Sequence, residues 1–231
     1  MNILAIDTID DILSSALSTK AGVWYSEIDA GARHSELLLE SIVLLFSSSG
    51  IKPEKLNLIA CLQGPGSFTG LRIGFSTAKG LGMALGVPIT AVPTLDCIAY
   101  PLNFWPGLVI PVIDAKRGCF FTALYRGKNR LTEYMDAAPE TIIAEIKKVS
   151  LPHPEPLILT GSGAVMLFPF LAATFPDIIL NPHSRNGRAK ELLEIAKDIK
   201  IDNNSVFSSV PVYIRKSDAE INGGRKQQIG F

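Results

Sequence analysis

The order of predicted strands and helices repeats along the chain, and this repeat constrains the fold more than any other feature of the sequence. Alternating or continuous apolar runs predict strands, and apolar residues at helical spacing predict helices. The predicted elements of the first half, three strands and then helix, strand, helix and strand, are residues 3–7, 13–19, 23–29, 35–49, 56–62, 67–85 and 88–92. Those of the second half, three strands and then helix, strand and helix, are residues 108–113, 119–125, 131–135, 139–148, 156–159 and 188–199.

A duplicated βββαβα pattern predicts two α/β lobes that face a cleft, the architecture of the actin, Hsp70 and sugar-kinase class. A proline-rich crossing at residues 101–106 separates the two series. We therefore expect an N-terminal lobe over residues 1–104, which carries partner-binding helices, and a C-terminal lobe over residues 105–231. The polar, glycine-rich tail from Val210 is expected to be ordered only in part.

Composition excludes several classes of protein. The 231 residues include 22 Lys+Arg and 22 Asp+Glu, so the formal net charge is zero, whereas proteins that grip nucleic acid unaided usually have a basic excess. The three cysteines form no CxxC pair and are expected to be small buried residues in a reducing compartment. No basic region precedes the first apolar stretch, and prolines interrupt the uncharged residues 97–113. We expect a cytoplasmic protein with no signal peptide and no membrane span.

One glycine-rich run, residues 63–70, joins a predicted strand to a predicted helix. Free N–H groups at a helix N-terminus make such a turn a natural phosphate site. The run lacks the Gly-Lys-Ser/Thr of a P-loop and the third glycine of a dinucleotide fingerprint, and Pro65 removes one donor. The alternative is a tight turn with Ser67 as helix N-cap, and these residues alone favour it over phosphate binding.

The other loops that could hold ATP in a two-lobed fold are poor in glycine. Residues 7–11 have none, residues 114–118 have one, and residues 160–163 could be a remnant of a loop on the adenosine side. Phosphates need close approach of the backbone at both hairpins, which calls for glycine. We therefore expect no nucleotide hydrolysis and no cofactor bound by the isolated chain.

Candidates for metal or acid–base chemistry are sparse. The three histidines, His34, His153 and His183, lie too far apart for an i, i+4 ligand pair, so no metal is expected. His34 is expected at the surface or as a helix cap. Three aspartates, Asp7, Asp96 and Asp114, could be catalytic carboxylates but more often end strands and satisfy turns.

The two N-terminal helices have an unusual pattern. Residues 35–49 are apolar almost all round, and residues 67–85 carry glycine or alanine every four residues, from Gly70 to Gly82. We expect the stripe of small residues in the second helix to face the core. We expect its opposite face to bind a partner, because Phe75 and Met83 lie there beside the only charged residues of the helix, Arg72 and Lys79. The expected interface consists of Glu36, Leu37, Glu40, Val43, Leu44, Arg72, Phe75, Lys79 and Met83. The alternative is that other parts of the fold cover both helices.

Four motifs resemble, in order and spacing, those of the TsaB (YeaZ) family, which is related to the TsaD/Kae1 family. They are Ile6-Asp-Thr8, Arg33-His-Ser-Glu-Leu-Leu38, Gly64-Pro-Gly-Ser-Phe-Thr-Gly-Leu-Arg-Ile-Gly74 and Pro211-Val-Tyr-Ile-Arg215. Residues 112–118 also look like that family's hairpin in the second lobe. The resemblance covers nearly the whole chain and is densest over residues 1–100.

The resemblance implies a non-catalytic subunit of the complex that forms N6-threonylcarbamoyladenosine at position 37 of tRNAs reading codons that start with adenine. It implies a TsaD-like catalytic subunit and a TsaE-like ATPase as partners, with tRNA bound only through the complex. From the two apolar helices we further expect a homodimer when the chain is alone, and use of the same surface by the catalytic subunit. Two alternatives of another class remain: a stand-alone ATPase or metabolite kinase, and a metallopeptidase.

Overall fold

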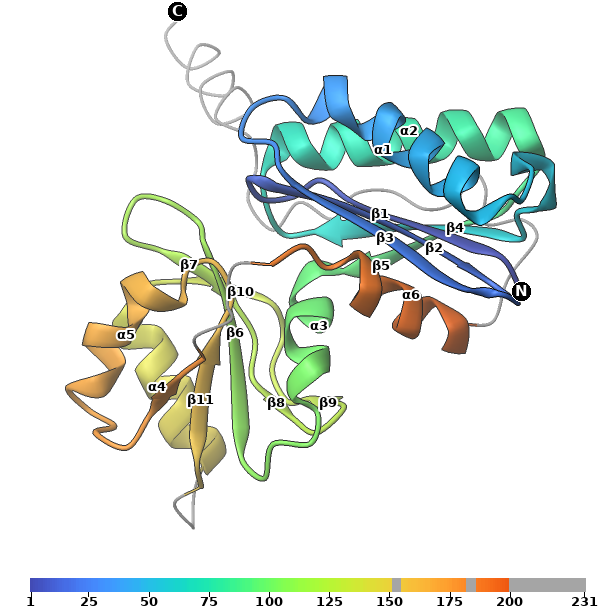
Figure 1. The fold of residues 1–231 in the computed structure, drawn as a ribbon. Coiled ribbons are helices and arrows are strands. Elements are labelled where there is room, and N and C mark those ends of the chain that lie inside the picture. The colour runs from blue at the N-terminus through green and yellow to red at the C-terminus, as the bar shows by residue number, and fades with distance from the viewer. Residues whose placement is uncertain (151–154, 182–185, 200–231) are drawn as a thin grey trace, which may run out of the picture.

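The computed structural model describes residues 1–150, 155–181 and 186–199, which form two β-sheets with helices packed around each (Figure 1). The first sheet has the strand order β3-β2-β1-β4-β5, with β1 antiparallel to β2 and parallel to β4. Its strands are β1 (Ile3–Asp7), β2 (Ile12–Thr19), β3 (Gly22–Asp29), β4 (Leu58–Gly64) and β5 (Ile89–Pro93). Helices α1 (His34–Ser49) and α2 (Phe68–Leu85) lie side by side on one face of this sheet.

The second sheet has the order β10-β7-β6-β11-β12, and a small hairpin, β8 and β9, pairs with β6 beside β7. Its strands are β6 (Leu108–Asp114), β7 (Phe120–Thr122), β8 (Tyr125–Arg126), β9 (Asn129–Arg130), β10 (Met135–Ala137), β11 (Leu157–Thr160) and β12 (Ile179–Leu180). The remaining helices are α3 (Thr94–Ala99), α4 (Pro139–Ser150), α5 (Ala164–Ala172) and α6 (Ala189–Asp198), with short 3₁₀ turns at Pro53–Lys55 and Tyr100–Leu102.

Both sheets have the same topology. In each, the first strand is central, the second and third follow antiparallel on one side, and the fourth and fifth follow parallel on the other. A helix precedes the fourth strand and another precedes the fifth, α1 and α2 in the first lobe and α4 and α5 in the second. The structure therefore confirms the predicted two-lobed, actin-like α/β fold.

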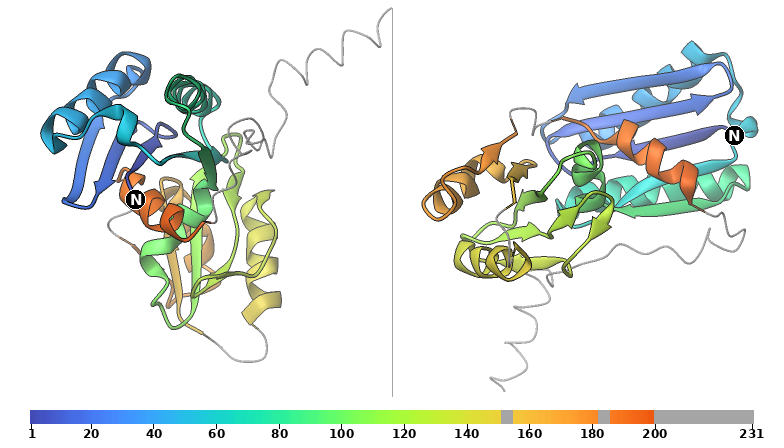
Figure 2. Two further views of the ribbon diagram at one scale, coloured as in Figure 1. Left: turned by 90° about the vertical axis from the view of Figure 1, so that its right-hand side faces the viewer. Right: turned by 90° about the horizontal axis from the view of Figure 1, so that it is seen from below.

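The helix that ends each series packs on the other lobe. In α3, Leu95 and Ile98 pack with Val109 and Ile113 of the second sheet, while α6 packs beneath β1 and β2 of the first. Figure 2 shows α6 crossing the face of the first sheet opposite α1 and α2. The two lobes are thus joined by exchanged helices as well as by the chain between β5 and β6. The boundary at residues 104 and 105 stays a prediction.

Helices on both faces of the first sheet explain why β1 is buried along its whole length. Leu4 and Ile6 point toward α1 and α2, whereas Ile3 and Ala5 point toward α6. A strand covered on two faces reads as a continuous apolar run rather than an alternating one. Strand β3, at the edge of the sheet, is only half buried.

Most predicted elements are confirmed, within one or two residues at their ends. The predicted strand at residues 131–135 is wrong, because Leu131 N donates to Leu124 O at 2.8 Å beside the β8–β9 hairpin, and the next strand begins only at Met135. The predicted strand at residues 119–125 is divided into β7 and the start of β8. Helices α3 and α5 were not predicted; α5 contains Pro169 and is short. His153, His183 and the expected tail lie outside the described residues.

Candidate functional site

The glycine-rich run at residues 63–70 is a turn that the chain itself fills. Ser67 is the N-cap of α2, as predicted, and its Oγ accepts a hydrogen bond from Gly70 N at 3.2 Å. Ser67 N donates in turn to Ile9 O of the β1–β2 turn at 3.3 Å. N–H groups at this helix end are thus bound to the protein's own oxygens, which supports the tight-turn interpretation over the phosphate one.

The glycines of α2 allow the β1–β2 turn to pack directly on the helix backbone. A Cβ on Gly70 would lie 2.0 Å from Thr8 O, and one on Gly74 would lie 2.6 Å from Thr8 Oγ1. Thr8 Oγ1 also donates to Gly70 O at 2.7 Å. The stripe of small residues predicted that α2 packs closely against another segment. That segment is the β1–β2 turn, which the stripe contacts at Thr8.

The second lobe repeats this arrangement at residues 160–163. A Cβ on Gly161 would lie 2.3 Å from Val112 O, and one on Gly163 would lie 2.8 Å from Asp114 N. Gly163 N donates to Val112 O at 3.0 Å. At Gly70 and at Gly161 the space that a Cβ would fill is thus occupied by backbone near the end of the central strand of the lobe.

A buried ion cluster closes the end of β1. The Asp7 side chain is fully buried and accepts hydrogen bonds from Ile9 N at 3.1 Å and Arg188 N at 2.8 Å. Burial raises the pKa of Asp7, and the charge of Arg188 opposes that rise. Arg188 Nη2 binds Asp10 Oδ2 at 2.5 Å. Burial by itself lowers the pKa of Arg188, but the charges of Asp10 and Asp7 outweigh it, and the guanidinium stays charged.

Asp114 occupies the equivalent position in the second lobe, at the end of β6. It accepts hydrogen bonds from Lys116 N at 2.7 Å and Lys116 Nζ at 2.6 Å. Partial burial raises the pKa of Asp114, but these bonds and the Lys116 charge prevail, so its pKa lies below the ordinary value. Lys116 and Arg117 both have positive φ, 62° and 57°, the strained region that glycine adopts most easily.

The two turns face each other across a cleft of about 800 Å³ between the lobes. The charged residues that line it are three carboxylates, Asp10, Asp11 and Asp114, and one ammonium, Lys116. Asp10 is paired with Arg188 and Asp114 with Lys116, so salt bridges compensate two of these three carboxylates. Apolar side chains from both lobes also line it, namely Ile9, Phe68, Ile73, Ile113, Phe121 and Met166, together with the hydroxyl residues Thr8, Ser67, Thr69 and Ser162.

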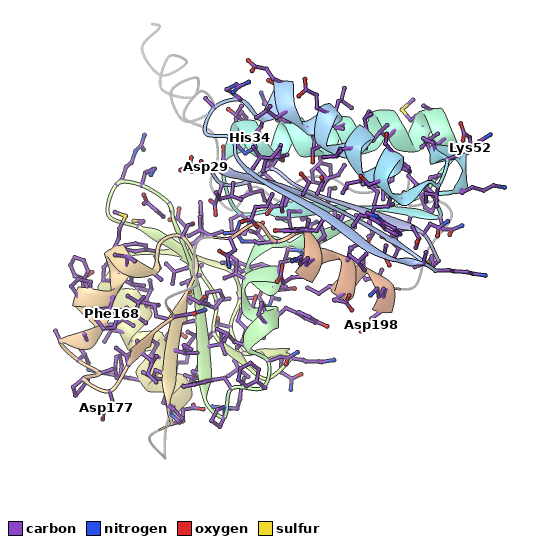
Figure 3. The ribbon with its side chains drawn as sticks, viewed as in Figure 1. Asp29, His34, Lys52, Phe168, Asp177 and Asp198 are labelled. Atoms are coloured by element: carbon purple, nitrogen blue, oxygen red, sulfur yellow. The ribbon has the colours of Figure 1, made fainter. Side chains whose placement is uncertain are left out.

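His34 also lines this cleft, at the end of α1 that faces the second lobe (Figure 3). The expectation that it lies at the surface is wrong, because its side chain is buried. It makes no capping hydrogen bond, and its Nε2 has no hydrogen-bond partner among the described residues. Within residues 1–150, 155–181 and 186–199, no group of three or more His, Cys, Asp or Glu side chains could hold a metal ion.

The outer face of α1 and α2 exposes large apolar side chains. Val43 is 62% exposed, Leu44 58% and Met83 66%, and Leu39 beside them is exposed to a similar degree. We call these four residues the outer face. The helical pattern predicted Val43, Leu44 and Met83 as part of the interface. Leu39 belongs to the same apolar run of residues 35–49 but was not among the predicted interface residues.

Phe75 does not lie on the outer face. It is only 4% exposed and packs in the core with Ile6, Ile42 and Cys61. Its place on the predicted interface is therefore wrong: α2 rests on both the sheet and the β1–β2 turn, so its buried face is wider than the glycine stripe. Leu37 is half-buried against the same core.

The charged residues of the predicted interface lie on the same two helices as the outer face. Glu36 pairs with Arg33 at 2.9 Å, and Glu40 is exposed. The Arg72 guanidinium lies 3.8 Å from the centre of the Phe68 ring. Lys79 is half-exposed. Arg188 and its link to Asp7 and Asp10 were not predicted, because no local signal connects residues that far apart in the sequence.

Comparison with known proteins agrees with this fold. The family model for TsaD, the tRNA N6-adenosine threonylcarbamoyltransferase, matches residues 26–223. The Bacillus subtilis tRNA threonylcarbamoyladenosine biosynthesis protein TsaB is 30% identical over 223 residues, which cover 95% of this chain and 96% of that protein. The chain belongs to the TsaB family.

Further members of the TsaB family show the same likeness. The Escherichia coli TsaB is 34% identical over 128 residues, covering 54% of this chain and 55% of that protein. The solved structure of YeaZ from Pseudomonas aeruginosa has the same fold, with a TM-score of 0.70, 22% identity, and coverage of 92% of this chain and 99% of that one. In the part of the chain that the structure describes, no helix is both long and apolar enough to cross a membrane.

Proposed function

We propose that this protein is a non-catalytic, cytoplasmic subunit in the formation of N6-threonylcarbamoyladenosine at position 37 of tRNAs reading codons that start with adenine. Its task is to bind and stabilise a catalytic subunit of the TsaD type. The outer face of α1 and α2 is the observation that carries the proposal. The TsaB relatives are named as tRNA threonylcarbamoyladenosine biosynthesis proteins, which supports the assignment to this reaction.

The outer face favours a protein partner over solvent. Its large side chains lie on two neighbouring helices, and full burial of each is worth about 1.5–3 kcal/mol. Glu36 and Glu40 on α1 are negatively charged and Arg72 on α2 is positively charged. A partner with similar helices could therefore place an opposite charge against each of them. A related two-lobed subunit can present such helices.

The same surface allows two copies of this chain to pair when the catalytic subunit is absent. A twofold arrangement sets α1 of one copy against α2 of the other. The catalytic subunit then replaces one copy, and a TsaE-type ATPase joins the assembled pair. Because the formal net charge is zero, we expect tRNA to bind through the complex and only weakly to this chain alone.

The interlobe cleft supports a role without catalysis. Two of its three carboxylates are in salt bridges, and protein backbone lies against Gly70 and Gly161 of the glycine-rich turns. A stand-alone ATPase or kinase needs an open phosphate cradle at these turns. A tight complex with Mg-ATP and turnover by the purified chain would revive that alternative.

Reconstitution tests the proposal. The chain is mixed with tRNA, threonine, bicarbonate, ATP and the upstream threonylcarbamoyl-adenylate synthase, with or without the TsaD-type and TsaE-type subunits. We expect modified adenosine only when the TsaD-type subunit is present, and more of it when this chain is added. Modification by the chain in the absence of that subunit contradicts the proposal.

A further inference from the structure

Helix α3, which leads from β5 of the first lobe into the second lobe, is packed into the cores of both. Cys97 is fully buried and lies in the same core of the first lobe as Leu193 of α6. Leu95 and Ile98, on another face of the helix, lie in the core of the second lobe with Val109 of β6. Protein interiors are close-packed, so a helix of six residues that is held in two cores cannot turn relative to either lobe without losing contacts.

Asp96 ties the same helix to the second lobe by hydrogen bonds. Its Oδ1 accepts one hydrogen bond from the Tyr125 hydroxyl at 2.5 Å and another from the Tyr134 hydroxyl at 2.8 Å. Tyr125 begins β8 and Tyr134 immediately precedes β10, so the two bonds reach two separate segments of the second lobe. Hydrogen bonds to a carboxylate are stronger than those between neutral groups. Asp96, which the sequence offered as a possible catalytic carboxylate, is not among the described residues that line the interlobe cleft.

The return of the chain to the first lobe ends in a similar set of bonds. Arg188, the N-cap residue of α6, binds Asp10 at 2.5 Å, and its backbone N–H donates to Asp7 at 2.8 Å. The next backbone N–H, that of Ala189, donates to Ser14 Oγ at 3.0 Å. The chain thus crosses between the lobes twice, and each crossing leads into a helix that is bonded to the lobe it enters.

These two crossings differ from a hinge. Lobes that close around a substrate move about a few residues in loops or at the ends of elements, which absorb the change in φ and ψ. Here the first crossing enters a helix that is buried in both lobes, and α3 also contacts α6 of the second crossing. A rotation of one lobe against the other therefore has to separate α3 from α6 or from the second sheet, and in the second case it breaks the bonds of Asp96.

We propose that Asp96, Tyr125 and Tyr134 form a lock that fixes the angle between the two lobes and so holds the interlobe cleft at one width. The lock prevents the closure by which a two-lobed enzyme surrounds its substrate. It is independent of the surface proposed for the catalytic subunit, because α3 lies on the side of the first sheet opposite α1 and α2 (Figure 1).

Distances between spin labels on the two lobes test the proposal by pulsed electron paramagnetic resonance. The labels are attached at Lys52→Cys in the first lobe and Asp177→Cys in the second, which are both exposed positions (Figure 3). Cys119→Ser removes the one native cysteine that is not buried. Excess unlabelled chain keeps distances between copies out of the signal. The parent should give one narrow distance distribution, and Asp96→Ala should broaden it at least about twofold, because the lobes can then rotate.

Glu133→Ala is the matched control. Glu133 precedes Tyr134 in the sequence but pairs only loosely with Arg130, at 3.7 Å on the surface, and should leave the distribution as it is in the parent. Circular dichroism shows whether each variant folds. If Asp96→Ala does not fold, Tyr134→Phe decides, since it keeps the half-buried ring and removes only the hydroxyl; it should broaden the distribution in the same way.

A second pair of labels, at Lys52→Cys and Asp29→Cys toward opposite ends of the first lobe, separates lobe rotation from unfolding (Figure 3). Its distribution should stay narrow in Asp96→Ala. The proposal is overturned if the parent already shows a broad or double distribution between the lobes, or if the folded Asp96 or Tyr134 variant stays as narrow as the parent. Equal broadening within the first lobe would overturn it as well, since the bonds of Asp96 would then hold the fold rather than the angle between the lobes.

Discussion

Arg188 joins the start of α6 to Asp10 of the β1–β2 turn, with Nη2 2.5 Å from Oδ2, across 178 positions of sequence. The same guanidinium lies 3.7 Å from the buried carboxylate of Asp7. This cluster ties the last described helix to the first turn of the chain, and so fixes the floor on which the two lobes meet.

Arg188→Gln should lower the free energy of unfolding by about 3–5 kcal/mol, because it leaves buried carboxylates without their cation. Lys197→Gln, which removes a cation from an exposed pair on the same helix, should change it by no more than about 0.5 kcal/mol. Urea unfolding followed by circular dichroism measures both. Equal effects of the two variants would show that the Arg188 cluster adds nothing beyond a surface pair.

The pKa of Asp7 gives the stability a pH dependence of predictable sign. Burial raises the pKa of Asp7, so the folded chain binds its proton more tightly than the unfolded chain. Its contribution favours folding below the unfolded pKa, about 4, and is lost as the pH rises through the folded pKa. Asp7→Asn removes this loss, and its unfolding free energy should fall less steeply than the parent's above pH 4. A steeper fall would reverse the assigned sign.

Two glycines of α2 should respond in opposite directions to the same substitution. Gly70→Ala forces a Cβ to within 2.0 Å of Thr8 O, and should destabilise the fold by about 1–3 kcal/mol. Gly80 has open space at its Cβ position, so Gly80→Ala should stabilise by about 0.5–1 kcal/mol. Chemical unfolding distinguishes the two signs; stabilisation by both would mean that the β1–β2 turn yields without strain.

Alanine substitution of Phe75 and of Met83 should affect the stability of the chain very differently, although both residues lie on α2. Phe75→Ala removes a side chain from the core and should destabilise the chain by about 3–5 kcal/mol. Met83→Ala alters a side chain that is 66% exposed, and should change the stability of the dissociated chain by about 0.5 kcal/mol or less. Unfolding curves at low chain concentration compare them; a large loss from Met83→Ala would place Met83 in the core.

Local patterns in the sequence predicted most of the fold but little of what joins its parts. The spacing of apolar residues predicted β1, α1 and α2, because that spacing reflects which faces of an element are buried. The glycine spacing of α2 predicted a close contact without identifying Thr8 as its partner. Phe75 was predicted on the wrong face of α2. The helix packs on both the sheet and the β1–β2 turn, so its buried face is wider than the glycine stripe from which the prediction was made. Arg188 depends on the return of α6 to the first lobe, which no local pattern contains.

In the proposed function, the outer face of α1 and α2 binds a catalytic subunit of the TsaD type. Leu44→Glu places a charge where burial is proposed and, at an exposed position, should leave the fold intact. Ile179→Glu is the control, an exposed apolar residue of the second lobe. Titration of each variant with the TsaD-type subunit, followed by calorimetry, measures the affinity. We predict that Leu44→Glu weakens binding at least about tenfold while Ile179→Glu binds as the parent does. Unchanged affinity of Leu44→Glu would contradict the proposed binding surface.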